Sequence, residues 1–286
     1  MKICFNNEIV NAKDKIFNTK NRALKYGDGF FESIRLIQGK APFLDLHFQR
    51  LISNLKLLDF EIPNYFSVTH FEELLKKLAH ENCIESGGRA RINIFRVGDG
   101  NYVSQSSHLN FIIEMQPLND SQFKLNEKGL RLGVYRENLK SVSSLGNVKS
   151  NSSLLFVLAG LWSKNHGFDD ALILNTQNRI CEATASNLFV FRENELLTPA
   201  LSEGCVDGVM RKIITKISEK TACRTQETQI ELEELESAEE VILTNAVQGL
   251  KWVEHFGGTT FRNSKSKQLI ALLNEKATKV VSSKLY

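Results

Sequence analysis

Alternating and helical hydrophobic patterns divide the first part of the chain into short strands and amphipathic helices. Residues 2–10, KICFNNEIV, alternate between apolar and polar positions and predict an edge strand that turns at Asn6–Asn7. Residues 31–44 predict a strand, a glycine turn and a second strand. Leucines near helical spacing predict a helix over residues 45–60, and a second helix is expected over about Phe71–Asn82. Two further strands, over residues 89–97 and 109–115, complete this α+β region.

The second half repeats this mixture of strands and helices. A strand is expected over residues 130–136, strands separated by two turns over 170–199, and a strand, a break and a strand over 239–256. Helices are expected over residues 207–220 and from about Ser264 onward. Another helix should follow Ser150, Asn151 and Ser152, which are good N-cap residues. Its apolar positions recur at helical spacing and predict one broad buried face: Leu154, Leu155, Val157, Leu158, Leu161 and Trp162.

A polar stretch without periodicity separates the two halves. Residues 116–128 therefore predict a linker between a small N-terminal α/β domain, residues 1–115, and a larger C-terminal domain, residues 129–286. The 286 residues suffice for two such domains. The fold class indicated is α/β or α+β, with helices packed on mixed sheets.

Charge and composition exclude several classes of function. The net charge is only +3 and the basic residues are scattered, so no nucleic-acid surface is indicated. No apolar run approaches the ~20 residues that span a bilayer, and the N-terminus does not resemble a signal peptide. The five cysteines are widely spaced without a C-x-x-C pair, which favours reduced, buried thiols in a cytoplasmic protein. The six histidines form no metal-binding motif, so no metal site is expected.

Three charged residues stand in unusual surroundings. Lys149 lies at or just before the first turn of the apolar helix, an end that carries partial positive charge. For any single lysine, the alternative of an ordinary position in a solvated loop is favoured. Glu182 interrupts a strand-like run of small and apolar residues, where it is either paired or faces outward. Arg50 shares a helix face with leucines, so it either reaches inward or snorkels to the surface.

Two further segments have the character of anion-binding loops. Residues 202–212 contain a glycine-rich turn that opens a helix at about Asp207 to Met210, and the free N–H groups of such a helix start bind anions. Residues 242–246, ILTNA, end a strand in small polar residues. A lysine, an acid, an arginine and a helix N-terminus together are what pyridoxal 5′-phosphate requires of a protein.

The order of these blocks resembles the class IV aminotransferase family of pyridoxal-phosphate enzymes, which have fold type IV. The similarity runs through YGDGFFESIR, HFQRL, GNVKSN, EATASNLF, GCVDGVMR and ILTNA, and covers nearly the whole chain. It implies a two-domain fold like that of D-amino-acid aminotransferase, with the cofactor between the domains. It also implies a homodimer.

The resemblance assigns a role to each matching residue. Lys149 matches the Schiff-base lysine, Arg50 the phosphate-binding arginine, and Glu182 the acid paired with the pyridine nitrogen. The remaining cofactor-binding positions are Ala185, Val209, Met210, Asn245 and Ala246. Because Met210 and Ala246 stand where the family has polar residues, phosphate contacts there are expected from backbone N–H groups. The substrate positions implied are Tyr26, Phe31, Arg96 and Tyr102.

Local details separate the reactions of this family. The tyrosine that often follows the lysine in branched-chain aminotransferases is missing after Lys149, and residues 95–103 have no histidine of the kind that D-amino-acid aminotransferases use. The Gly-rich loop with Arg96 and Tyr102 looks more like that of 4-amino-4-deoxychorismate lyases, which form 4-aminobenzoate and pyruvate in folate synthesis. Glu32, in contrast, looks like aminotransferases.

The lyase reading is therefore favoured over an aminotransferase acting on branched-chain or other amino acids. A third alternative, an inactive dimeric binding module that kept the fold, is disfavoured by the intact set of Lys149, Glu182 and Arg50. A small-molecule amine is the expected substrate. For Arg96, the competing reading is a surface pair with an acid such as Asp99.

Overall fold

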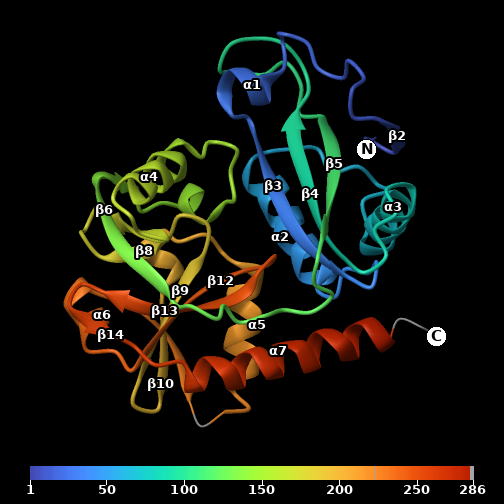
Figure 1. The fold of residues 1–286 in the computed structure, drawn as a ribbon. Helices are drawn as coiled ribbons and strands as arrows, with labels where there is room; N and C mark the ends of the chain where they lie inside the picture. The colour runs from blue at the N-terminus through green and yellow to red at the C-terminus, as the bar shows by residue number, and fades with distance from the viewer. Residues whose placement is uncertain (222, 284–286) are drawn as a thin grey trace. The chain divides into compact units, whose positions relative to one another are not determined.

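A computed structural model describes residues 1–221 and 223–283, which form two compact units (Figure 1). The first unit contains residues 1–122, residues 149–152 and the chain from Ala277 onward. The second contains residues 123–148 and 153–276. The short segment 149–152 thus belongs to the first unit although the chain on both sides of it belongs to the second.

The first unit is built on an antiparallel sheet of five strands in the order β2-β1-β5-β4-β3. The strands are β1 (Lys2–Phe5), β2 (Glu8–Asn11), β3 (Gly29–Ile37), β4 (Gly87–Arg96) and β5 (Leu109–Leu118). β1 and β2 form the predicted hairpin with its turn at Asn6–Asn7. Along β3 and β4 the register pairs Phe31 with Asn93 and Ser33 with Arg91.

Two amphipathic helices accompany this sheet, α2 (Leu44–Leu57) and α3 (Val68–Glu81), and a short helix, α1 (Arg22–Tyr26), precedes β3 (Figure 1). Side chains alternate between the two faces of each strand. One face of β3 and β4 supplies apolar core residues, namely Phe30, Ile34, Leu36, Ala90, Ile92 and Ile94. Glu32 belongs to this same face, and it pairs with residues of α2. The opposite face carries polar side chains, which matter for the site below.

The second unit contains a mixed sheet of nine strands. The order is β11-β10-β9-β12-β13-β6-β7-β8, with β14 paired to β13. The pairs β13–β6, β6–β7 and β10–β11 are parallel, and the others are antiparallel. The strands are β6 (Leu130–Lys140), β7 (Asp170–Asn175), β8 (Ile180–Ala183), β9 (Asn187–Arg192), β10 (Glu195–Pro199), β11 (Arg224–Thr228), β12 (Glu240–Asn245), β13 (Gly249–Phe256) and β14 (Thr259–Thr260).

Short and long helices complete the fold. They are η1 (Ser144–Asn147), α4 (Leu154–Asn165), η2 (Leu201–Glu203), α5 (Val209–Ser218), α6 (Leu232–Glu236) and α7 (Ser264–Ser283). The apolar side of α5 is fully buried through Val209, Met210, Ile213 and Ile214. This burial fixes the start of α5 at the end of a glycine-containing loop, as the sequence predicts.

The helix α4 begins at Leu154 after Ser153, so Lys149 lies five positions before it. The prediction of its buried face is wrong for four of the six residues: Leu154 is 70%, Val157 53%, Leu158 38% and Leu161 52% accessible. Ala159 and Ser163 are the buried residues of the helix, and the partly buried Leu155 and Trp162 pack beside Ala159 against Tyr135, Ala171 and Ile173. In a helix that is apolar on most sides, spacing alone cannot choose the buried face.

Several smaller expectations also differ from the structure. Residues 41–44 form no second strand, because the turn after Ile37 leads directly into α2. Residues 170–199 contain four strands with three connections between them, whereas the sequence predicts two turns. Cys83 is exposed, whereas the other four cysteines are buried; all five are free thiols. Among the helices of the described residues, none is long and apolar enough to cross a membrane.

Candidate active site

Lys149 is attached to the edge of β3. Its carbonyl oxygen accepts the Phe31 N–H at 3.0 Å, and the next residue but one, Asn151, donates its N–H to the Gly29 oxygen at 3.0 Å. The Lys149 ammonium lies 4.6 Å from the centre of the Phe31 ring, within the range of a cation–π contact. The lysine is therefore positioned by strand-like pairing with β3, and the side chain beside it is a predicted substrate residue.

The glycines of the YGDGFF motif permit this close approach. Gly27 ends α1 in the left-handed conformation, at φ +64°, which a residue with a Cβ adopts only at a cost. A Cβ on Gly29 would lie 2.2 Å from the Ile94 oxygen and 2.8 Å from the Asn151 amide nitrogen. Any side chain at residue 29 would push the segment 149–152 away from β3.

The polar face of β3 and β4 carries several cationic groups next to Phe31. Strand alternation puts Arg35, Arg89 and Arg91 on the same face as Phe31, and Arg91 is register partner of Ser33. The Arg91 guanidinium lies 3.6 Å from the centre of the same Phe31 ring that Lys149 contacts. Burial lowers the pKa of Arg91, and Glu114 on β5 opposes the shift, but an arginine remains charged.

Some polar atoms on this face have no partner within the described part of the chain. They include the Arg89 Nε and the Asn93 Oδ1, both buried. A buried polar atom without a hydrogen bond is costly, and such atoms gather where a ligand binds. The face next to Lys149 thus offers donors and positive charge to an anionic small molecule.

Arg50 is held in a buried trio on the other face of the same sheet. Its guanidinium donates from Nε to Glu32 Oε1 at 2.8 Å and from Nη2 to Glu32 Oε2 at 2.5 Å. His47 Nδ1 lies 2.7 Å from Glu32 Oε2. Burial would raise the pKa of Glu32, but Arg50 and His47 outweigh it and hold that pKa at about 2. Burial also lowers the pKa of His47, which Glu32 opposes only in part. The trio is therefore one ion pair with a neutral imidazole that donates to the carboxylate.

In the second unit, Glu182 is buried and fully engaged. Its carboxylate forms an ion pair with the Lys140 ammonium and accepts the Val206 N–H at 3.0 Å. Lys140 also donates to the Gly146 oxygen at 2.9 Å. The outward-facing reading of Glu182 is thus excluded. A buried carboxylate is costly unless it is joined to a cation or to several donors, and Glu182 has both kinds of partner.

The start of α5 lies close to the ends of β9 and β12. The helix begins at Val209 with no side chain capping its first N–H groups. A Cβ on Gly208 would lie 1.9 Å from Asn187 Oδ1, so only glycine fits between the helix start and β9. Asn187 donates in turn to the Val206 oxygen at 2.8 Å.

Polar groups at the end of β12 complete this region. Asn245 donates to the Ser186 hydroxyl at 3.1 Å, and its own Oδ1 accepts the Val247 and Gln248 N–H groups. The Thr244 hydroxyl is buried and has no partner within the described residues. An uncapped helix start and an unpaired buried hydroxyl in one region fit a phosphate group.

These features fit the pyridoxal phosphate that the sequence implies. Val209, Met210 and Ala246 offer no polar side-chain atoms, so they would contact phosphate through backbone N–H groups, as expected. Ala185 lies in the exposed turn between β8 and β9, next to Ser186. The assignments of Lys149, Arg50 and Glu182 to the cofactor stay predictions.

The loop after β4 differs from the simple expectation. Arg96 is already engaged: it donates to Asp28 at 3.2 Å and to the Leu58 and Asp59 oxygens at 2.5 and 2.9 Å. The competing pair with Asp99 is not formed either, because Asp99 pairs with Lys20. A substrate role for Arg96 stays a prediction, but its observed contacts anchor the loop.

Tyr102 lies at the tip of that loop and is 89% exposed. Its ring centre is 5.5 Å from that of Tyr26, whose hydroxyl donates to the Gly100 oxygen at 3.4 Å. The structure thus brings two of the predicted substrate residues together, Tyr26 with Tyr102, and a third, Phe31, to Lys149.

Arg89, Arg91 and Asn93 were missed by the sequence reasoning. The signal was present, since RARINIF alternates polar and apolar residues and puts these three on one face of the strand. Lys140 was also missed. It lies on β6 and Glu182 on β8, the two strands on either side of β7, and the spacing of the two residues in the sequence does not indicate this strand order.

The chain is similar to known proteins along most of its length. The family model described as "Amino-transferase class IV" matches residues 29–255. D-alanine aminotransferase of Listeria monocytogenes is 26% identical over 96% of this chain and 94% of its own. Aminodeoxychorismate lyase of Bacillus subtilis is 29% identical over 86% of this chain and 83% of its own. The branched-chain aminotransferase of Thermoproteus uzoniensis shares the fold, with a TM-score of 0.86 at 19% identity over 98% of this chain and 95% of that one.

Proposed function

Because the chain belongs to the class IV aminotransferase family, whose members depend on pyridoxal phosphate, we propose that it is a 4-amino-4-deoxychorismate lyase. The enzyme would release pyruvate and leave 4-aminobenzoate, the precursor used in folate synthesis. When bound, the cofactor supplies an electron sink for the carbon that carries the substrate amine. The residues of this chain bind, orient and move the proton.

Lys149 carries the covalent attachment and the proton transfer in this proposal. Its Nζ would hold the cofactor and would take the proton from the amine-bearing carbon of the substrate. Pyruvate would leave from the adjacent carbon as the bond between that carbon and the ether oxygen breaks. Glu182, which is paired with Lys140 and accepts the Val206 N–H, would face the pyridine nitrogen and favour its protonated form. The start of α5 and the end of β12 hold the phosphate.

The observation that supports the lyase most is the cationic face beside Lys149. Arg91 and Lys149 contact the same Phe31 ring, and Arg89 and Asn93 leave buried polar atoms unpaired next to them. Aminodeoxychorismate carries two carboxylates, whereas the branched-chain amino acids carry one and an apolar side chain. A second carboxylate gains a charge-assisted hydrogen bond on such a face, but an apolar side chain does not.

An aminotransferase is the second candidate, and it too has support. A D-alanine aminotransferase and an aminodeoxychorismate lyase show similar identities to this chain. Every α-amino acid presents one carboxylate, which Arg91 alone could bind. The two candidates therefore differ in how strongly the arginines select a second carboxylate.

The test is Arg91→Gln, assayed in parallel with aminodeoxychorismate and with L-leucine plus 2-oxoglutarate. Loss of one charge-assisted bond costs about 1.5–3 kcal/mol, so kcat/KM for the dicarboxylate should fall at least tenfold. Arg136→Gln, a change at an exposed position of β6, is the matched control and should leave both activities unchanged. If Arg91→Gln lowers both substrates equally, the arginine does not select a second carboxylate, and the aminotransferase is favoured.

We also propose that the chain forms a homodimer through the exposed side of α4. Leu154, Val157, Leu158 and Leu161 make an uncharged apolar stripe along the helix. Single exposed apolar residues are ordinary, but a continuous stripe marks an interaction surface. An uncharged stripe is complementary to itself under a twofold axis, the commonest symmetry of protein dimers, so a second copy is the proposed occupant.

A further inference from the structure

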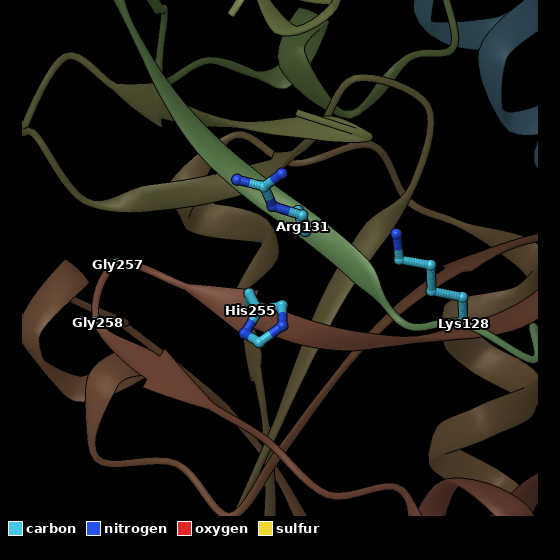
Figure 2. A pocket seen from close by; sticks show the side chains of 5 residues that line it. All are labelled: Lys128, Arg131, His255, Gly257 and Gly258. Carbon is cyan, nitrogen blue, oxygen red and sulfur yellow. The ribbon is translucent and has the colours of Figure 1, made fainter. Parts of the chain in front are cut away.

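An open surface cavity of about 410 Å³ in the second unit is lined by basic side chains and two glycines, most of them exposed (Figure 2). Arg131 comes from β6, His255 from β13, Lys128 from the segment before β6, and Gly257–Gly258 from the turn after β13. Arg131 and His255 are register partners in a parallel pair, so their side chains lie next to each other. None of the lining residues is acidic.

The two cations of this cavity lack a protein counter-charge. Over residues 1–221 and 223–283, no carboxylate pairs with the Lys128 ammonium or the Arg131 guanidinium. Both cations come from the same segment, three positions apart, and a bound anion would lower the repulsion between them.

The carboxylates nearby are directed to other partners. Asp169 accepts the backbone N–H of Arg131 at 2.8 Å rather than its guanidinium. The Glu254 Cβ packs against Gly129, at the irregularity in the register between β13 and β6. Glu236 reaches the turn at Gly257 from α6 but does not line the cavity. The His255 Nδ1 interacts with the Thr260 hydroxyl at 3.1 Å, which orients the imidazole.

We propose that this cavity binds a small phosphate-bearing anion, separately from the cofactor. Guanidinium, ammonium and imidazole N–H groups are the usual ligands of phosphate, and the cavity exceeds the size of a single phosphate group. Arg131 and Lys140 are nine positions apart on β6, so this site lies about 30 Å along the strand from the Lys140–Glu182 pair. The site is therefore independent of the residues assigned to the reaction.

The test uses inorganic pyrophosphate and the enzyme loaded with pyridoxal phosphate, so that the cofactor's phosphate site is already filled. Isothermal titration in a phosphate-free buffer should give saturable binding with a Kd below about 1 mM. The double variant Lys128→Gln/Arg131→Gln should weaken this binding at least tenfold. Arg136→Gln, an exposed arginine on the same strand but outside the cavity, is the control and should bind as the parent does.

Cofactor content and turnover without pyrophosphate should be the same in all three proteins, since none of the changed residues belongs to the candidate active site. The proposal is overturned if the parent shows no saturable binding. It is also overturned if the double variant binds as tightly as the parent, or if Arg136→Gln weakens binding equally, which would indicate attraction by overall charge alone.

Discussion

At the scale of single residues, each of the two units contains a buried carboxylate that is stabilised in a similar way. Glu32 and Glu182 are both carboxylates that the fold buries, and each is joined to a cation and to a second donor. A buried carboxylate without these partners would be protonated or would destabilise the protein. In the first unit these partners keep Glu32 ionised, and the carboxylate orients Arg50 in turn.

The Glu32 trio predicts a loss of stability in acid. The pKa of Glu32 is about 2 in the folded protein, below its ordinary value of 4.5, so its contribution is complete above about pH 4.5. As the pH falls toward 2 this contribution is lost, and it amounts to roughly 3 kcal/mol. The lowered pKa of His47 acts in the same direction, because the unfolded chain takes up that proton first below about pH 6.5.

Urea unfolding at several pH values between 6 and 3 checks this prediction. Glu32→Gln should be less stable than the parent at pH 6 and should lose less stability on acidification. Glu85→Gln, a change at an exposed glutamate of the same unit, is the control and should follow the parent. Parallel curves for all three proteins would mean that the trio contributes nothing to acid sensitivity.

The sequence reveals a site residue when its immediate neighbours in the chain mark it, and misses one whose role depends on a distant segment. Lys149, Glu182 and Arg50 stand out because each charge interrupts an apolar pattern, and the family motifs then assign their roles. Arg91 and Arg89 belong to an ordinary alternating strand, and their importance depends on the neighbour opposite, Phe31 on β3. Lys140 becomes a partner of Glu182 only through the strand order, which no local pattern specifies.

At the scale of elements, the sequence predicts most helices and strands but not which side of a helix is buried. α2, α3 and α5 have polar faces that fix their orientation, and their predicted positions are confirmed. α4 is apolar on most of its circumference. Its small residues Ala159 and Ser163 are buried, whereas Leu154, Leu158 and Leu161 are exposed. Short elements such as β11 and α6 were missed, because four or five residues give too little periodicity.

The loop after β4 is an element whose order depends on one buried arginine. Arg22 donates from Nε to Asp28 at 2.7 Å, and its two Nη atoms bind the Asn101 and Tyr102 oxygens at 2.7 and 3.1 Å. Arg22→Leu should therefore release residues 97–108 while leaving the sheet folded. Removing several buried hydrogen bonds to a charged group costs a few kcal/mol, mostly in local opening of the loop.

Hydrogen exchange and limited proteolysis measure this effect. Residues 97–108 should exchange at least tenfold faster in Arg22→Leu than in the parent, and protease should cut there first. Lys20→Met removes only the exposed pair with Asp99 and serves as the control, with little expected change. Equal exchange in all three proteins would show that Arg22 does not hold the loop.

At the scale of the whole molecule, the apolar stripe of α4 predicts the assembly. Replacing Leu158 and Leu161 by Lys puts two charges on the stripe without touching the buried side of the helix at Ala159 and Ser163. The double variant should sediment as a monomer at micromolar concentration, whereas the parent sediments as a dimer. Glu137→Lys/Arg136→Glu, a change at exposed positions of β6, is the control and should stay dimeric. A monomeric parent would contradict the proposed assembly, and a dimeric double variant would place the interface elsewhere.

The central claim is that this chain cleaves a dicarboxylate rather than transferring its amine. The direct measurement supplies the purified enzyme, loaded with pyridoxal phosphate, with aminodeoxychorismate, L-leucine or D-alanine, the amino acids together with 2-oxoglutarate, and follows 4-aminobenzoate, pyruvate and glutamate. The account predicts that 4-aminobenzoate and pyruvate form in equal amounts from aminodeoxychorismate. The kcat/KM for aminodeoxychorismate should be at least tenfold higher than that for either amino acid, and Lys149→Ala should abolish the reaction. Faster formation of glutamate from L-leucine or D-alanine, with no 4-aminobenzoate from aminodeoxychorismate, would contradict it.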